Sequence, residues 1–291
     1  LLIEELDLSQ INFNGNTLTL QCARLNKIVG PETFNGSLLL LPKSCRLTEF
    51  TLEGISNIQG DFQCKDYSYV KEFVMPFIRV AGDMTIALNS GSVNTAAEIE
   101  FPKLQEIGGT LTLGTNRNAN NITFPLLKKI LGSCSVTTYK LKNDIEFTNL
   151  ESIGTDGADA QIKFEIEATN ILCPKLKTIN GKFDIATSSF MFDMEVDKVS
   201  YPNVESISEN LSITCPYSDF GSNGILSIDF SGLKSVKGIS ISGQGDVTDF
   251  SSFKYLFENN VLTGESQWSV KECGYNPTFQ EMKDGKYKLA E

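Results

Sequence analysis

The sequence predicts an all-β protein, a right-handed β-solenoid of about nine coils, and three observations support this prediction. Six segments of one pattern follow one another, with register positions spaced 23 to 29 residues apart. Within each segment apolar and polar residues alternate, as they do in half-buried strands. No long stretch shows the 3.6-residue apolar period of a helix. Periods of this length are typical of repeat architectures, in which each unit stacks only on its neighbours.

The repeat is clearest in the middle of the chain. The six segments span residues 99–113, 122–136, 145–154, 171–185, 199–213 and 228–241. Five of them carry an aromatic residue at one register position and the sixth carries a cysteine: Phe101, Phe124, Phe147, Tyr201 and Phe230, with Cys173 as the substitute. Degenerate copies at 50–64 and 73–86 extend the pattern upstream. The coils therefore continue well beyond the clearest segments.

Each part of the repeat has a physical role. The Ile-x-Phe start alternates as a strand does, and a following proline such as Pro102 ends the ladder because it lacks an N–H group. The segment 102–107 and its equivalents are expected to form single helical turns at a corner. A glycine follows the corner, where we expect a positive φ; the positions are Gly109, Gly132, Gly154, Gly181 and Gly238. A second alternating strand completes the coil, so each coil should contribute two strands and two corners.

The repeat pattern also sets the predicted domain boundaries. We expect one solenoid domain over residues 1–262, with the clearest coils at 99–241. Solenoid ends must be covered, and an aromatic group at about 247–262 fits a C-terminal cap: Phe250, Phe253, Tyr255, Leu256 and Phe257. Residues 263–291 are predicted to form a non-repeat tail that packs back as a hook or extends away. Its sole tryptophan, Trp268, either anchors this tail or offers an exposed carbohydrate platform.

Composition narrows the chemistry. The chain has no histidine, which removes the commonest general base and metal ligand, so we predict no catalytic residues, no metal site and no cofactor. A net charge of −11 disfavours nucleic acid as a partner. The seven cysteines form no C-x-x-C pair, and several fall on inward repeat positions, so we interpret most as small buried hydrophobes. No apolar run is long enough for a transmembrane segment.

The Phe-Pro-x-Leu-x-x-Ile-x-Gly-x-Leu-x-Leu pattern of residues 101–113 resembles the receptor L domain, a leucine-rich β-solenoid of receptor ectodomains and fungal cell-wall proteins. It is also similar to leucine-rich surface proteins of gut Bacteroidetes, which carry a tail like residues 274–285. The resemblance covers roughly residues 45 to 260 and implies an extracellular or cell-surface location. Since no disulfide modules are present, it favours a bacterial or fungal protein. Any lipid anchor is expected in a segment preceding Leu1.

Two sets of residues are candidate binding sites. The outward positions of the second strands form a polar face. This face suits a glycan or protein ligand, and its small and β-branched polar residues are also what a merely solvated sheet prefers: Thr85, Thr112, Ser135, Asp184, Ser212 and Ser240. The insertion 190–199 and the loop 155–161 interrupt the solenoid and form a candidate binding edge. The insertion carries three alternating carboxylates, which fit either a calcium ion or a solvated strand: Asp193, Glu195 and Asp197.

Three functions remain open. The first is a non-enzymatic cell-surface binding or adhesion module whose protein or glycan ligand the sequence does not name. The second is a structural spacer that holds other domains away from a surface. The third is a β-helical carbohydrate-active enzyme, which needs clustered acids together with a base. The four arginines, Arg24, Arg46, Arg79 and Arg117, lie outside any acidic cluster, which disfavours the enzyme.

Overall fold

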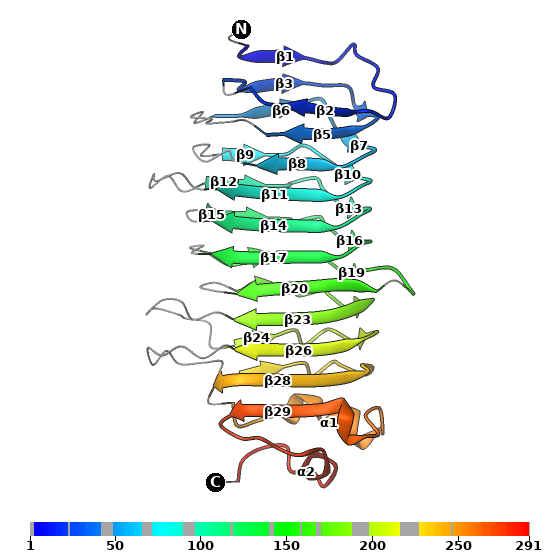
Figure 1. Cartoon of the computed structure of the whole chain (residues 1–291), viewed down its shortest axis with the longest axis vertical. Helices are drawn as coiled ribbons and strands as arrows, with labels where there is room; N and C mark the ends of the chain where they lie inside the picture. Colours follow the sequence, from blue (N-terminus) through cyan, green and yellow to red (C-terminus); the bar gives the residue numbers. More distant parts are fainter. Residues whose placement is uncertain are drawn as a thin grey trace.

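The computed structural model shows a rod of stacked coils with the two termini at opposite ends of its long axis (Figure 1). It describes residues 3–22, 24–41, 49–65, 72–89, 97–116, 119–139, 143–157, 159–166, 170–187, 198–215, 227–245 and 247–290. The strands pair in parallel with the equivalent strands of neighbouring coils, and helices are few. The all-β solenoid prediction is therefore confirmed.

The longest sheet, called the long sheet below, has eleven strands that correspond to the predicted second strand of each coil. In spatial order they are β2 (Thr17–Leu20), β5 (Ser37–Leu40), β8 (Phe62–Lys65), β11 (Met84–Asn89), β14 (Leu111–Asn116), β17 (Cys134–Tyr139), β20 (Ala160–Ile166), β23 (Gly181–Thr187), β26 (Asn210–Cys215), β28 (Gly238–Gly245) and β29 (Trp268–Cys273). The last strand comes from the segment predicted to be a non-repeat tail.

The predicted first strands form three shorter sheets on another side of the coil. They are β1 (Glu5–Asp7), β3 (Lys27–Val29) and β6 (Thr51–Glu53) in one sheet, β9 (Glu72–Val74), β12 (Ala97–Glu100), β15 (Ala119–Thr123), β18 (Ile145–Glu146) and β21 (Ile171–Leu172) in the next, and β24 (Lys198–Ser200) and β27 (Ser227–Asp229) in the last.

The corner between these two sides carries a third, two-residue strand rather than the helical turn expected there. Eight such strands form a sheet of their own: β4 (Thr33–Phe34), β7 (Asn57–Ile58), β10 (Arg79–Val80), β13 (Glu106–Ile107), β16 (Lys129–Ile130), β19 (Ser152–Ile153), β22 (Thr178–Ile179) and β25 (Ser206–Ile207). The long sheet has eleven strands and the corner sheet has eight, so the number of coils depends on which sheet is counted. Either number differs slightly from the nine coils predicted.

Like residues stack on like residues through the core. The rings of Phe101 and Phe124 are 4.7 Å apart and nearly parallel, and those of Phe124 and Phe147 are 4.8 Å apart. These distances match the spacing of adjacent strands, about 4.8 Å. The inward cysteines Cys64, Cys134 and Cys173 are buried, as predicted. One continuous apolar core therefore runs through the described coils.

The stack changes character at Cys173, where the five-stranded sheet ends at β21 and does not pair with β24. Tyr201 lies at this break, and its hydroxyl donates a 3.0 Å hydrogen bond to the buried carbonyl of Ile171. Burial raises the pKa of the Tyr201 phenol well above its usual value, and Cys173 beside it adds to the shift. The tyrosine hydroxyl thus replaces a ladder bond that the two strands do not make.

The C-terminal end of the rod is covered by short helices and by residues of the final segment. Short helices η1 (Ser251–Phe253), α1 (Lys254–Glu258), η2 (Glu265–Gln267) and α2 (Phe279–Lys283) close the end of the rod (Figure 1). Four of the five predicted cap residues are buried, and Tyr255 is exposed. The tail packs back as a hook, because the N–H of Phe250 donates to the carbonyl of Tyr287 and that of Leu289 to Thr248.

The glycines after the corners serve a different purpose from the one predicted. Among the five positions named, only Gly154 has a positive φ, of 80°. At Gly132 a Cβ atom would lie 2.6 Å from the carbonyl carbon of Gly109 in the preceding coil. Real Cβ atoms essentially never approach other atoms so closely. Glycine is needed at such corners because adjacent coils touch backbone to backbone.

Candidate functional site

The outward side chains of the long sheet form one continuous row. Parallel register holds each member beside the next, one strand spacing of about 4.8 Å away. From β11 to β29 the row is Thr85, Thr112, Ser135, Lys163, Asp184, Ser212, Ser240 and Ser269, and this part is called the polar row below. The six outward residues predicted as a candidate binding face all lie in this row, from Thr85 to Ser240, and nothing here tests whether they bind a ligand.

Sequence reasoning missed two members of the row. Lys163 was overlooked because a loop displaces its strand along the sequence, although the alternation of residues 160–166 contains the signal. Ser269 was overlooked because β29 belongs to the tail, where the repeat motif is absent. Only the completed sheet shows that Ser269 continues the row beyond Ser240.

A second outward row runs beside the first, two residues further along each strand. Its members are also mostly small: Ala87, Gly114, Thr137, Glu165, Ala186, Thr214 and Ser242. In the described part of the chain, no helix lies over the strands from β11 to β26 (Figure 1). Two adjacent rows of short side chains therefore form a broad, solvent-facing surface whose residues are mostly half-buried.

Charged pairs occupy the middle of this face. Lys163 forms an ion pair with Glu165, and the hydroxyl of Thr137 donates a 2.8 Å hydrogen bond to the same carboxylate. The Lys163 hydrogen bond, helped by Thr137, holds the pKa of Glu165 below its usual value against the opposing effect of burial. Asp184 pairs with Lys182 at 2.9 Å. The face thus offers hydroxyl groups toward both ends and paired charges at its centre.

The starts of the long strands carry polar side chains that already have structural partners. The side chain of Asp61 accepts a 2.8 Å hydrogen bond from the backbone N–H of Asp83, and Asp83 accepts one of 2.7 Å from Thr110. Ser133 accepts a similar bond from Gln161 at 3.0 Å. Because these side chains tie one coil to the next, we do not count them among the ligand-binding candidates.

A hollow of about 500 Å³ lies at the C-terminal end of the polar row, lined by Ser269, Val270, Pro277 and Phe279 among others. Trp268 also lines it, yet only 5% of this residue is exposed and its indole N–H donates to the carbonyl of Pro277. The tryptophan therefore anchors the tail, and it is not an exposed carbohydrate platform.

The predicted cation-binding carboxylates Asp193, Glu195 and Asp197 lie outside the described residues. Among the residues that are described, no three histidine, cysteine or acidic side chains come together as metal ligands. No helix within the described ranges is long and apolar enough to cross a membrane.

The fold and the face together define a class, a parallel β-solenoid with a broad uncovered polar sheet. No family model, no curated protein and no solved structure matches the chain in the three comparisons made. The solenoid shape alone does not single out one family.

Proposed function

We propose that the protein is a non-enzymatic binding module whose polar row contacts a protein or glycan ligand. The observation that carries the proposal is the register of the long sheet, which aligns eight outward side chains from eight successive strands. Hydroxyl groups repeated at strand spacing suit an extended ligand that offers many hydrogen-bonding groups. Each contact is weak, so affinity would come from many contacts along the rod.

The proposed location is extracellular or at a cell surface. This part of the proposal is supported by the resemblance of the repeat to receptor L domains and to leucine-rich surface proteins of bacteria and fungi.

A structural spacer is the second candidate, and one observation favours it. The two termini lie at opposite ends of the rod (Figure 1), as they would in an element that separates two attached domains. The two functions are compatible, but only the binding module requires the polar row.

The test is binding of the purified chain to an array of polysaccharides and to extracellular matrix proteins, followed by variants of the polar row. Ser135→Arg with Ser212→Arg should weaken binding at least about tenfold by filling the flat face. Thr123→Arg is the matched control, because Thr123 is an outward residue of β15 on another side of the coil. Equal losses in both variants, or no ligand on either array, would leave the spacer as the better reading.

A further inference from the structure

The hollow beside Ser269 is bordered by two parts of the C-terminal segment. Strand β29 forms one wall, and residues 276–280 form the other. The chain continues beyond this wall as α2 and turns back along residues 248–250, where the N–H of Phe250 donates to the carbonyl of Tyr287. The volume of the hollow, about 500 Å³, lies within the range of about 300–1,000 Å³ that is typical of small-molecule sites. The hollow is therefore large enough for a ligand of that kind.

The hollow is continuous with the polar row. Ser269 is the last of the eight members of the row, and it also lines the hollow. Its neighbour in the row, Ser240, lies one strand spacing away, about 4.8 Å. A ligand that follows the row toward the C-terminal end consequently reaches the hollow at Ser269, so the row and the hollow form one surface.

The lining of the hollow combines apolar and polar groups. Phe279 and Pro277 are buried, and Val270 is half-buried. The Ser269 hydroxyl and the Glu265 carboxylate make no side-chain hydrogen bond or ion pair within the described part of the chain, whereas the other polar side chains of the lining are hydrogen-bonded within the segment. Among the described lining residues none is a lysine or an arginine. Such a lining suits a neutral ligand that has both an apolar face and hydroxyl groups.

The spacing of the polar row distinguishes between a peptide and a polysaccharide. Side chains on one face of an extended peptide recur at every second residue, about 6.6 Å apart. That distance is out of step with outward groups that recur at the strand spacing of about 4.8 Å. One pyranose ring advances an extended β-linked polysaccharide by roughly one strand spacing. Successive sugar units can therefore stay beside successive strands, and the row favours a polysaccharide.

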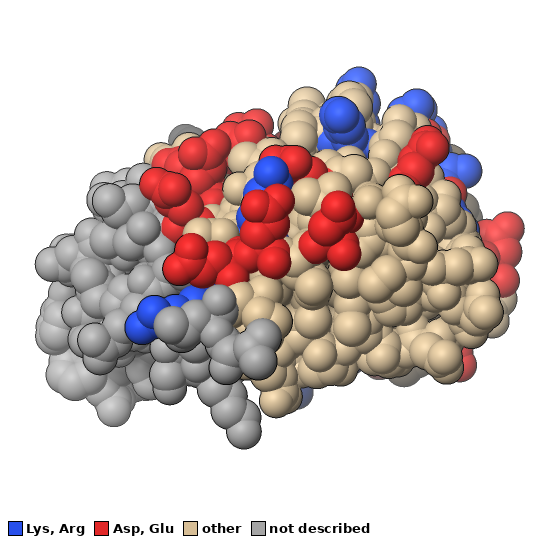
Figure 2. Space-filling model, turned by 90° about the horizontal axis from the view of Figure 1, so that it is seen from above, with Lys and Arg blue, Asp and Glu red and all other residues tan. Residues whose placement is uncertain are grey.

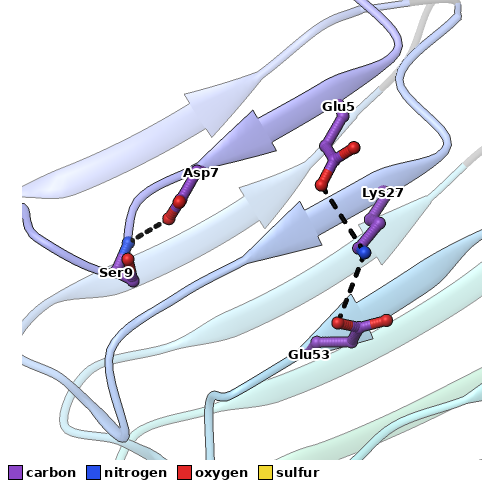
Figure 3. Close-up of polar contacts among 5 residues, drawn as sticks. All are labelled: Glu5, Asp7, Ser9, Lys27 and Glu53. Carbon is purple, nitrogen blue, oxygen red and sulfur yellow. Dashed lines mark hydrogen bonds and ion pairs between the residues drawn. The ribbon is translucent and has the colours of Figure 1, made fainter.

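The charges of the protein disfavour an acidic polysaccharide. The net charge is −11, and Figure 2 shows carboxylates gathered over part of the described surface. On the long sheet, Lys163 and Lys182 each pair with a neighbouring carboxylate. On another side of the rod, the ammonium of Lys27 lies 3.5 Å from both Glu5 and Glu53 (Figure 3). An acidic sugar unit would have to compete with these carboxylates, so a neutral chain is favoured.

We propose that the hollow holds the end unit of a neutral, β-linked polysaccharide whose chain follows the polar row. This inference rests on the proposed binding function and names its ligand class. The hydroxyl of Ser269 and the carboxylate of Glu265 bond to hydroxyl groups of the end unit. Val270 and Phe279 contact the apolar face of its ring. About six sugar units reach from the hollow to Ser135, which lies five strands from Ser269.

The probes are β-linked disaccharides and hexasaccharides of glucose, mannose and N-acetylglucosamine, with a β-linked hexasaccharide of mannuronic acid as the acidic control. Binding to the full chain is measured by isothermal titration calorimetry. At least one neutral hexasaccharide should bind about tenfold or more tightly than the disaccharide of the same sugar and than the mannuronic acid chain. Binding by none of the neutral hexasaccharides, or tighter binding of the acidic chain, would overturn the proposal.

Glu265→Ala and Lys271→Ala form a matched pair, because each removes one exposed charge near Ser269 and only Glu265 lines the hollow. Glu265→Ala should weaken the binding of the disaccharide and the hexasaccharide about tenfold, since it removes a charged hydrogen-bond acceptor. Lys271→Ala should weaken both by less than about threefold. An equal or larger effect of Lys271→Ala would show that the sugar is not held in the hollow, and it would overturn the proposal.

The polar-row variant separates a failure of the hollow from a failure of the binding face. Ser135→Arg with Ser212→Arg should weaken hexasaccharide binding at least about tenfold and change disaccharide binding by less than about threefold, because a disaccharide fits within the hollow and its edge. If this variant weakens hexasaccharide binding and Glu265→Ala does not, the binding face stands and the inference about the hollow is overturned. If Glu265→Ala weakens both sugars and the row variant neither, the chain does not follow the row, and the proposed face is overturned with it.

Discussion

One amino-acid change, glycine to alanine, should have opposite effects at two positions of the solenoid. Gly132 follows a corner and touches the preceding coil, whereas Gly114 lies within β14 on the outward face of the long sheet. At Gly114 no atom lies within 4 Å of an added Cβ atom. The pair therefore separates the effect of coil contact from the general effect of replacing glycine.

The expected magnitudes follow from the surroundings of the added methyl group. At Gly132 it would lie 2.6 Å and 2.8 Å from the carbonyl carbon and oxygen of Gly109 and 2.9 Å from the nitrogen of Thr110. Backbone cannot move aside as a flexible side chain can, so the two coils must separate locally. Overpacking of this kind costs about 1–3 kcal/mol. Gly114→Ala should instead stabilise by up to about 1 kcal/mol, since alanine loses less conformational entropy on folding.

The assay is urea unfolding of both variants and the parent chain, monitored by far-ultraviolet circular dichroism. The midpoint should fall for Gly132→Ala and stay level or rise for Gly114→Ala, with a difference of about 1–4 kcal/mol in the free energy of unfolding. If the two variants agree within about 0.5 kcal/mol, coil-to-coil contact at the corner is not what selects glycine there.

Three further results are expected. Tyr201→Phe should lower the free energy of unfolding in urea by about 1–3 kcal/mol, because it leaves the buried carbonyl of Ile171 without its donor. Tyr255 is exposed, so Tyr255→Phe should change this free energy by less than about 0.5 kcal/mol. Equal effects would contradict the role of the Tyr201 hydroxyl as donor to Ile171. Burial raises the pKa of the Cys134 thiol from 9.0 to about 12. The buried neutral thiol therefore contributes its full stabilisation below pH 9. As the pH rises toward 12 the free energy of unfolding falls by up to about 1.4 kcal/mol per pH unit. Urea midpoints measured from pH 8 to 11 should fall less steeply in Cys134→Ala, and parallel curves would refute this. Phe124→Ala should lower the free energy of unfolding by about 3–5 kcal/mol, because it opens a gap between the stacked rings of Phe101 and Phe147. A loss under about 1 kcal/mol in thermal unfolding would contradict the packing of Phe124 in this stack.

The sequence was sufficient to predict the stacking because its signal is periodic and repeated. Phe101, Phe124 and Phe147 recur at one spacing, and a single parallel register brings them face to face. The same register determines which side chains point outward. Thr112 and Ser135 could therefore be placed beside each other before any coordinates were considered.

What the sequence did not show depends on contacts between coils. The corner glycines looked like sites of positive φ, and only the packing of Gly132 against Gly109 shows the real constraint. The two-residue corner strands are too short to leave an alternation that can be read. Ser269 joins the polar row through pairing with Ser240, although no repeat motif marks its strand.

The break in the shorter sheets was visible only as an exception in the repeat. A cysteine replaces the aromatic residue at 173 and a tyrosine replaces phenylalanine at 201. The structure explains the tyrosine, whose hydroxyl satisfies the Ile171 carbonyl where β21 and β24 do not pair. Departures from a repeat motif are in this case the places where the backbone pattern changes.

The claim on which the fold and the proposed binding face both depend is that the polar row is straight and in register. Spin labels carried on a bio-orthogonal amino acid at Thr85 and at Asp184, Ser240 or Ser269 test it through pairwise distances from pulsed electron resonance. The partners lie four, six and seven strands from Thr85, so the mean distances should increase by about 4.8 Å per strand, to roughly 19, 29 and 34 Å. Distances that do not grow in proportion to strand number would contradict the stacked register and, with it, the proposed face.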